Sequence, residues 1–269
     1  MSGQSQIIKY NTNSFQTTAS AAATILTRDI QYRGIATKNL IVREDTIRDG
    51  WSLVDAHYSN KIILISGWLI SDTGDNLKTL VDNVKGYLRE SEKNLDIETY
   101  GGSGVYRRWI ATPQSFEVPE EHWHITQVPF TCEFNCQPFG TNTSTTSVDL
   151  NTGSAISSSP YNESPSITGT YKTKPTITVT VNSETTMTIF KWDNNTTGDW
   201  IQIEPSGGFT AADVLIINCE DEEVTLNGSS VDFTGVFPHF NPGSNSLTLT
   251  ITAGAFNLDC SFTYYPTYL

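Results

Sequence analysis

The chain is poor in basic residues. It has 16 Lys and Arg against 29 Asp and Glu, which gives a formal net charge of −13. An acidic surface keeps a protein soluble and disfavours non-specific contact with nucleic acid or anionic membranes. No basic cluster stands out, since the pair Arg107-Arg108 lies between Tyr106 and Trp109 in a predicted strand. We therefore expect no specific readout of nucleic acid.

Long hydrophobic runs are also missing. The longest, KIILISGWLI at residues 61–70, is far shorter than the roughly 20 residues that a membrane-spanning helix needs. The N-terminal stretch MSGQSQIIKYN lacks the charged-then-apolar pattern of a secretory signal peptide. We expect a soluble protein that is made in the cytoplasm and does not insert into membranes.

Recognisable catalytic motifs are absent from the sequence. It has no Gly-x-Ser-x-Gly nucleophile elbow, no phosphate-binding loop and no His-Glu-x-x-His motif. Carboxylates gather between Asp213 and Glu223, where spacing alone would allow the acid/base pair of a glycoside hydrolase. Any β-rich protein has such carboxylates, so the pattern carries little information. We predict a protein that is not an enzyme and needs no cofactor.

Cysteine is scarce, with four in the whole chain. In a strand, Cys132 and Cys136 would point to one face about 13 Å apart, beyond the roughly 7 Å between Cα atoms that a disulfide spans. A lone Cys-x3-Cys also lacks the second ligand pair of a zinc knuckle. Cys219 and Cys260 lie in alternating strand patterns. We predict free buried thiols, with a Cys219–Cys260 disulfide or a metal site as the alternatives.

Two further stretches contain possible metal ligands. His122-x-His124 would place two imidazoles on one strand face with Glu120 and Glu121 nearby, but no third convergent ligand is visible. The acidic run at residues 220–223 lacks the spacing of a calcium-binding loop. The first stretch is more typical of a polar strand face and the second of a solvated hairpin corner. No metal site is predicted.

The sequence is rich in Thr, Ser, Asn and aromatic residues, which favours strands and turns. Residues 141–166, TNTSTTSVDLNTGSAISSSPYNESPS, contain almost no apolar side chain, and we interpret them as a linker. The chain is long enough for a domain on each side to bury its own core. We predict domains at residues 1–140 and 167–269.

The first half mixes strands with one helix. Serine, threonine and aspartate at 71–75 offer N-cap oxygens, and an apolar stripe with helical spacing follows: Leu77, Leu80, Val81, Val84 and Leu88. Strand patterns surround this helix at residues 61–70, 105–111 and 122–134. We predict an α+β domain whose β-sheet packs on a single amphipathic helix.

The second half is almost purely β. PTITVTV at 175–181 and SLTLTIT at 246–252 alternate strictly between apolar and polar residues. More short strand patterns follow one another, separated by turn signals such as Asn227-Gly228. About seven or more short strands with frequent turns are typical of a β-sandwich. The predicted fold class of the whole chain is mainly β.

A set of loose motifs runs through both halves. The first half has Gly67 in IILISGWLI, then the helix, then YRRW at 106–109 and a strand that closes before Pro138-Phe139. The second half has KPTITV at 174–179, the run DVLIINCEDEEVTLNG, the block FPHFNPGSN at 237–245 and the ending FTYYPTYL. Together they resemble the distal tail protein (Dit) family of long-tailed bacteriophages, and the resemblance covers nearly all of the chain.

The block at 237–245 carries the most specific part of this resemblance. Pro242-Gly243 favours a turn, and Asn245 is able to bond its own backbone before the next strand begins. We predict a structural corner between strands rather than a ligand site.

The resemblance implies a structural role in the virion, at the tip of the phage tail. Family members form a homohexameric ring whose N-terminal domains join the tail tube to the baseplate hub. A C-terminal domain, galectin-like in many members, projects outward toward other tail proteins or the receptor-binding proteins of host attachment. DNA passes through the ring, and an acidic lumen would keep it from sticking. On this view residues 11–60 form a long loop or an arm that reaches a neighbouring subunit.

A second class of function stays open beside this one. A carbohydrate-binding β-sandwich that contacts the host surface would use exposed aromatic residues such as Trp192 or Trp200 for sugar stacking. The fold would not decide between the two, because one fold hosts many functions.

Overall fold

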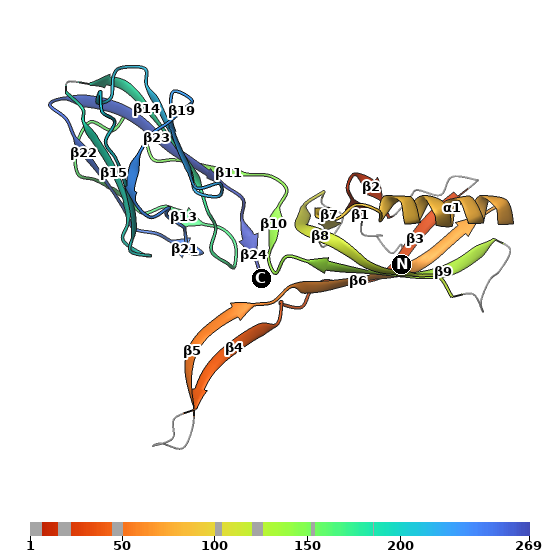
Figure 1. The fold of residues 1–269 in the computed structure, drawn as a ribbon. Helices are drawn as coiled ribbons and strands as arrows, with labels where there is room; N and C mark the ends of the chain where they lie inside the picture. Colours follow the sequence, from red (N-terminus) through yellow and green to blue (C-terminus); the bar gives the residue numbers. More distant parts are fainter. Residues whose placement is uncertain are drawn as a thin grey trace. The chain divides into compact units, whose positions relative to one another are not determined.

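The fold is described from a computed structural model of the chain. It describes residues 7–15, 23–44, 51–99, 104–119, 126–151, 154–184 and 186–269, the side chains of Glu44, Trp51 and Ser52 excepted. The chain divides into two compact units, one of residues 1–143 with Leu269 and one of residues 144–268. Both are built mainly from β-strands, which confirms the predicted fold class (Figure 1).

The first unit contains α1 (Gly74–Tyr87), the helix expected from the apolar spacing. Thr73 is its N-cap, and the Thr73 hydroxyl accepts a hydrogen bond from the backbone N–H of Asn76 at 3.2 Å. The buried positions are Leu77, Leu80, Val81 and Val84. Among the described residues, no helix has the length and apolar character needed to cross a membrane.

An antiparallel sheet packs on this helix in the order β2-β1-β7-β8-β9-β6-β3. Its strands are β1 (Ile8–Tyr10), β2 (Asn13–Ser14), β3 (Ala23–Gln31), β6 (Lys61–Ser71), β7 (Lys93–Glu98), β8 (Tyr106–Glu117) and β9 (Gln127–Cys136). A short strand, β10 (Gly140–Asn142), also pairs with β8. Burial alternates along β6, so that Ile63, Ile65 and Leu69 are fully buried. The helix covers this face of the sheet (Figure 1).

The segment 11–60, expected as a loop or an arm, contains regular structure wherever it is described. Besides β2 and β3 it holds β4 (Lys38–Glu44) and β5 (Trp51–Tyr58), which pair only with each other in a two-stranded sheet. This hairpin extends away from the main sheet of the first unit (Figure 1).

The second unit has two larger sheets and one small one. The six-stranded sheet has the order β11 (Thr146–Asp149), β23 (Phe256–Tyr264), β14 (Thr176–Glu184), β17 (Val214–Asn218), β18 (Glu223–Leu226) and β19 (Ser229–Ser230). The five-stranded sheet has the order β12 (Tyr161–Glu163), β22 (Leu247–Thr252), β15 (Ile189–Asn194), β16 (Asp199–Ile203) and β20 (Phe233–Gly235). The small sheet joins β13 (Ser166–Ile167) to β21 (Gly243–Ser244), and β24 (Thr267–Tyr268) follows near the end of the chain.

The inner faces of the two larger sheets form one apolar core. Trp192 lies at its centre, with ring centroids 6.2 Å from Phe262 and 6.3 Å from Phe240. The predicted alternation holds, since Ile177, Val179 and Val181 of β14 are buried. The second unit is therefore a β-sandwich, as the sequence indicated.

The stretch expected as a linker, residues 141–166, is folded instead. Within it, β11 pairs with β23 and β12 pairs with β22, and Leu150 and Ile156 are buried in the sandwich core. The division between the units falls at residues 143 and 144. The prediction failed because it counted apolar residues. An edge strand takes its hydrogen bonds from a sheet that already exists and needs only one or two buried anchors.

Candidate functional site

The β4–β5 hairpin is the most unusual surface of the first unit. Its strands are antiparallel, with Leu40 opposite Ala56 and Val42 opposite Leu53, and a bulge interrupts the register between Ile41 and Val42. The β-branched residues Ile41, Val42 and Val54 favour strands in both stretches. No described part of the first unit covers either face of the ribbon.

Five large apolar side chains of this hairpin are exposed; we call them the hairpin apolar surface. Their exposed fractions are 51% for Leu40, 47% for Ile41, 46% for Val42, 53% for Leu53 and 63% for Val54. A two-stranded hairpin is at best marginally stable by itself in water. Exposed apolar side chains gathered on one element often mark a surface that another protein covers.

The base of the hairpin is fixed to the first unit. The ring of Tyr58 meets Phe139 edge-on at 5.4 Å, and the Lys38 ammonium lies 5.6 Å from the centroid of Tyr58. The Ser59 backbone N–H and hydroxyl both donate to the carbonyl of Thr37. The apolar surface is thus presented from an anchored base.

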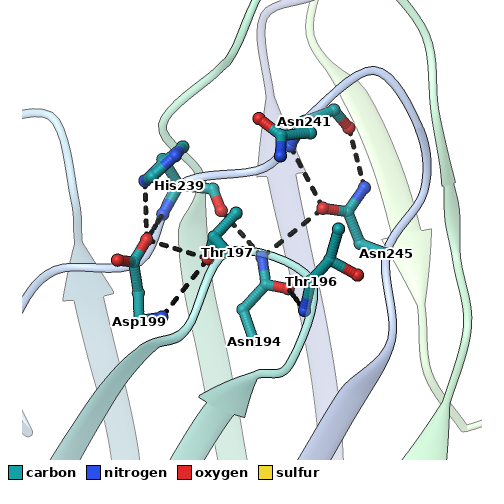
Figure 2. A network of polar contacts seen from close by, with 7 residues as sticks. All are labelled: Asn194, Thr196, Thr197, Asp199, His239, Asn241 and Asn245. Carbon is teal, nitrogen blue, oxygen red and sulfur yellow. Dashed lines mark hydrogen bonds and ion pairs between the residues drawn. The ribbon is translucent and has the colours of Figure 1, made fainter.

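A second candidate is the corner at residues 237–245, which contains a network of polar contacts (Figure 2). Asn245 is fully buried, and its side-chain amide donates to the carbonyls of Asn241 at 2.7 Å and Gly243 at 3.1 Å. Its side-chain oxygen accepts from the backbone N–H of Asn241 at 3.1 Å. Gly243 has φ +89°, which favours glycine.

The same network extends to the turn between β15 and β16. Asn194 donates to the backbone carbonyl of His239 at 2.8 Å, and His239 Nδ1 lies 2.6 Å from a carboxylate oxygen of Asp199. Thr197 donates to that same carboxylate at 2.9 Å (Figure 2). The contacts of His239 with Asn194 and Asp199 join this turn to the block at 237–245, which is therefore held as a structural joint.

All four cysteines are free and buried, which confirms the prediction for them. Burial raises the pKa of Cys132, Cys136 and Cys219 to about 12, so these thiols stay protonated and inert at neutral pH. Cys132 and Cys136 lie on one buried face of β9, and the strand continues to Cys136 itself.

Of the two stretches that contain possible metal ligands, the structure describes one. Residues 120–125, with His122 and His124, lie outside the described residues. The acidic run 220–223 forms the exposed corner between β17 and β18, where Asn218 braces the chain by bonding Asp221 at 2.6 Å. In the part of the chain that the structure describes, no three His, Cys, Asp or Glu residues converge on a metal position.

Asp213 stabilises a turn by accepting hydrogen bonds from its neighbours. Burial acts to raise its pKa, but hydrogen bonds from the Thr210 backbone at 2.7 Å and the Asn227 amide at 2.7 Å outweigh this and lower it. A carboxyl group stabilised as its anion is poorly suited to act as a general acid.

The two candidate stacking residues also differ, since Trp192 is fully buried and Trp200 is 38% exposed.

Sequence reasoning missed the hairpin apolar surface. A signal was present, because Leu40 to Val42 and Leu53 to Val54 are apolar runs within strand-like stretches. Such runs normally indicate buried strands, and only the structure shows that nothing in the described first unit covers them.

Comparison with known proteins provides a family match for the second unit. Residues 168–268 match the family described as "Siphovirus-type tail component, C-terminal domain". A comparison with curated protein sequences finds no match.

Solved structures extend the likeness to the whole chain. The Dit (gp 19.1) protein of phage SPP1, described as a paradigm of the hub adsorption apparatus in phages that infect Gram-positive bacteria, has a TM-score of 0.70 at 14% identity. The alignment covers 98% of this chain and 99% of that protein. A chain of the activated phage P2 baseplate with Ca has a TM-score of 0.42 at 8% identity over 96% and 97% of the two chains, too low to add to the argument.

These findings agree with each other and with the sequence motifs. The domain match lies in the β-sandwich, and the fold of SPP1 Dit accounts for the helix-backed sheet that precedes it. Residues 168–268 thus match the C-terminal domain of siphovirus-type tail components, and the chain as a whole has the fold of SPP1 Dit.

Proposed function

We propose that this protein forms a hexameric ring at the tail tip that joins the tail tube to the baseplate hub. In this proposal the first unit builds the ring. The second unit projects outward and presents itself to other tail proteins or to a receptor-binding protein. The role is structural, with no catalytic step, cofactor or metal.

The observation that carries the proposal is the hairpin apolar surface. Its five side chains are between 46% and 63% exposed, although the base of the hairpin is anchored. Covering it would remove apolar area from water, which stabilises an assembly by about 25 cal/mol per Å².

A second copy of this chain is the occupant we propose for that surface. Residues 38–58 carry three basic and four acidic residues, so the hairpin is nearly neutral in a chain of net charge −13. A neutral arm meets an acidic copy without strong repulsion. A hairpin that docks on a different part of the next copy makes a head-to-tail contact, which is the type of contact that closes into a ring.

Passage of DNA through the ring belongs to the same proposal. The net charge of −13 disfavours adsorption of a polyanion to the channel wall. Retention of double-stranded DNA on the purified assembly at physiological salt would contradict this part.

The mass of the purified protein in solution, measured by light scattering, tests the ring. The unmodified chain is expected near six times 29.7 kDa. Leu53→Asp introduces a charge into the hairpin apolar surface, so we expect the main species to shift to the mass of one chain. Covering an unpaired carboxylate costs about 3 kcal/mol per contact.

A matched control is available in the second unit. Val236 is 54% exposed, close to the 53% of Leu53, and lies far from the hairpin in sequence. Val236→Asp should leave the ring intact. A single-chain mass for the unmodified protein, or equal loss of assembly in both variants, would sink the proposal.

A further inference from the structure

The outer face of the five-stranded sheet carries a row of polar side chains that ends in an exposed tryptophan. Cross-strand pairing aligns Asn162 with Thr248, Thr248 with Asp193, and Asp193 with Trp200. Adjacent strands lie about 4.8 Å apart, so the row is roughly 14 Å long. Asp193 and Thr248 alternate with buried neighbours, and Asn162 and Trp200 are exposed, so the row points away from the sandwich core.

Trp200 is held in place at the end of this row. A Cβ atom on Gly235 of the neighbouring edge strand would come within 2.9 Å of Cε3 of the indole, so the ring packs directly on the glycine backbone. Gly235 has φ +106°, which other residues rarely adopt. The Val236 N–H donates to the Trp200 carbonyl at 2.8 Å. With 38% of the residue exposed, the indole is a fixed aromatic platform.

The polar groups beside this platform neutralise one another. Lys191 bonds Asp193 at 2.6 Å, and the Lys191 ammonium lies 5.1 Å from the centroid of the Trp200 ring. Thr248 receives a hydrogen bond from Asn195 at 2.9 Å and lies 2.7 Å from the Asn162 side-chain oxygen. The face offers carboxylate, amide and hydroxyl groups, with its charges paired.

We propose that this face binds a neutral oligosaccharide of two or three sugar rings. An indole face stacks on the C–H face of a pyranose, and planar carboxylate and amide groups bond pairs of sugar hydroxyls. A nucleic acid or acidic glycan is disfavoured, because the cation on the face, Lys191, is already paired with Asp193. An apolar peptide is disfavoured because the row beyond Trp200 is polar. The site lies in the second unit and does not depend on ring formation.

Titration calorimetry of the full chain with maltotriose, cellotriose and chitotriose tests the site. At least one trisaccharide is expected to bind with a Kd of about 1 mM or tighter, as suits a small exposed site. Trp200→Ala should weaken that binding roughly tenfold, whereas Trp200→Phe should retain most of it, because an aromatic ring remains for stacking. Ile216→Ala, which changes an apolar residue 37% exposed on the other large sheet, should have no effect.

Several outcomes would overturn the proposal. One is the absence of binding by all three sugars. Another is unchanged sugar binding in a folded Trp200→Ala variant. A third outcome would assign the face to a protein partner: no sugar binds, the unmodified chain captures a purified tail protein, and the Trp200→Ala variant does not. If Trp200→Ala does not fold, Thr248→Ala removes a hydroxyl from the middle of the row, and unchanged sugar binding in that variant would equally contradict the site.

Discussion

At the scale of single residues, Asn245 shows how one side chain fixes a corner between strands. Its side chain is fully buried, and its amide bonds backbone groups of Asn241 and Gly243. A buried polar side chain needs hydrogen-bond partners, and here the backbone of the turn supplies them. The identity of the residue follows from this geometry, since only asparagine offers a donor and an acceptor at this length.

Asn245→Ala should lower the free energy of unfolding of the second unit by about 2–3 kcal/mol, because it removes three hydrogen bonds of a buried side chain, each worth about 1 kcal/mol. Urea unfolding followed by circular dichroism measures the change. Asn195→Ala is the control. That residue is exposed and donates one side-chain bond, to Thr248, so its loss should cost about 0.5 kcal/mol or less. Equal effects of the two substitutions would contradict the assigned role of Asn245.

At the scale of elements, the contact between β3 and β6 explains the glycine in IILISGWLI. A Cβ on Gly67 would lie 2.2 Å from the carbonyl oxygen of Leu26 and 2.9 Å from Cα of Thr27. The register of the two strands shifts between Thr27 and Asp29, and this bulge brings the backbone of β3 against β6. The glycine in this motif is thus required by the close approach of β3 to β6.

Gly67→Ala should destabilise the first unit by about 1–3 kcal/mol, as overpacking against backbone atoms does. The adjacent Ser66→Ala, on the opposite side of the strand, should change the stability by about 0.5 kcal/mol or less. Chemical unfolding of both variants provides the comparison. A Gly67→Ala variant as stable as the unmodified chain would show that β3 does not pack as closely as the structure indicates.

At the scale of the whole molecule, buried thiols and a buried tyrosine that stay protonated determine how its stability changes at high pH. Burial raises the pKa of Cys132, Cys136 and Cys219 from 9.0 to about 12, and burial with the nearby Glu90 raises that of Tyr10 from 10.0 to about 12. The folded state keeps these protons up to about pH 12, whereas the unfolded chain releases the thiol protons from about pH 9. The unfolded state binds fewer protons in that window, so stability falls as the pH rises.

We therefore expect unfolding free energies that are flat from pH 7 to 8.5 and fall steeply above pH 9, by about 1.4 kcal/mol per pH unit for each thiol. Burial lowers the pKa of Lys61, which opposes the trend with one group. Cys132→Ala with Cys136→Ala should reduce the slope for the first unit by about 2.8 kcal/mol per pH unit. The cavities that the alanine substitutions leave lower the unfolding free energy by an amount that does not depend on pH. The comparison is therefore made between the slopes of the unfolding free energy against pH. Identical slopes would refute the role of these thiols.

Much of the molecule followed from local patterns in the sequence. Leu77, Leu80, Val81 and Val84 face the core as their spacing predicted, and Thr73 caps the helix through its hydroxyl. The alternation of Ile177, Val179 and Val181 marked a sandwich strand, and the spacing of Cys132 and Cys136 excluded a disulfide between them. These features depend on neighbours within a few residues, which is the range over which helical and strand periods act.

Other features depended on partners distant in sequence. The polar stretch at 141–166 was assigned to a linker, although β11 takes its hydrogen bonds from β23, more than a hundred residues later. The apolar runs of β4 and β5 lie in the segment 11–60 that was expected as a loop or an arm, and the exposure of Leu53 and Val54 is visible only because no element of the described first unit covers them. Trp192 and Trp200 were equal candidates until the sheet placed one inside and one outside.

The sequence by itself determined the helix, the strand-rich class, the free thiols and the family resemblance, because each follows from local spacing or from a short motif. Tertiary structure alone decided which apolar residues lie uncovered, where the units divide, and which tryptophan faces solvent beside Asp193 and Thr248. Exposure is a property of what packs against a residue, and packing partners are selected by the whole fold rather than by the neighbouring chain.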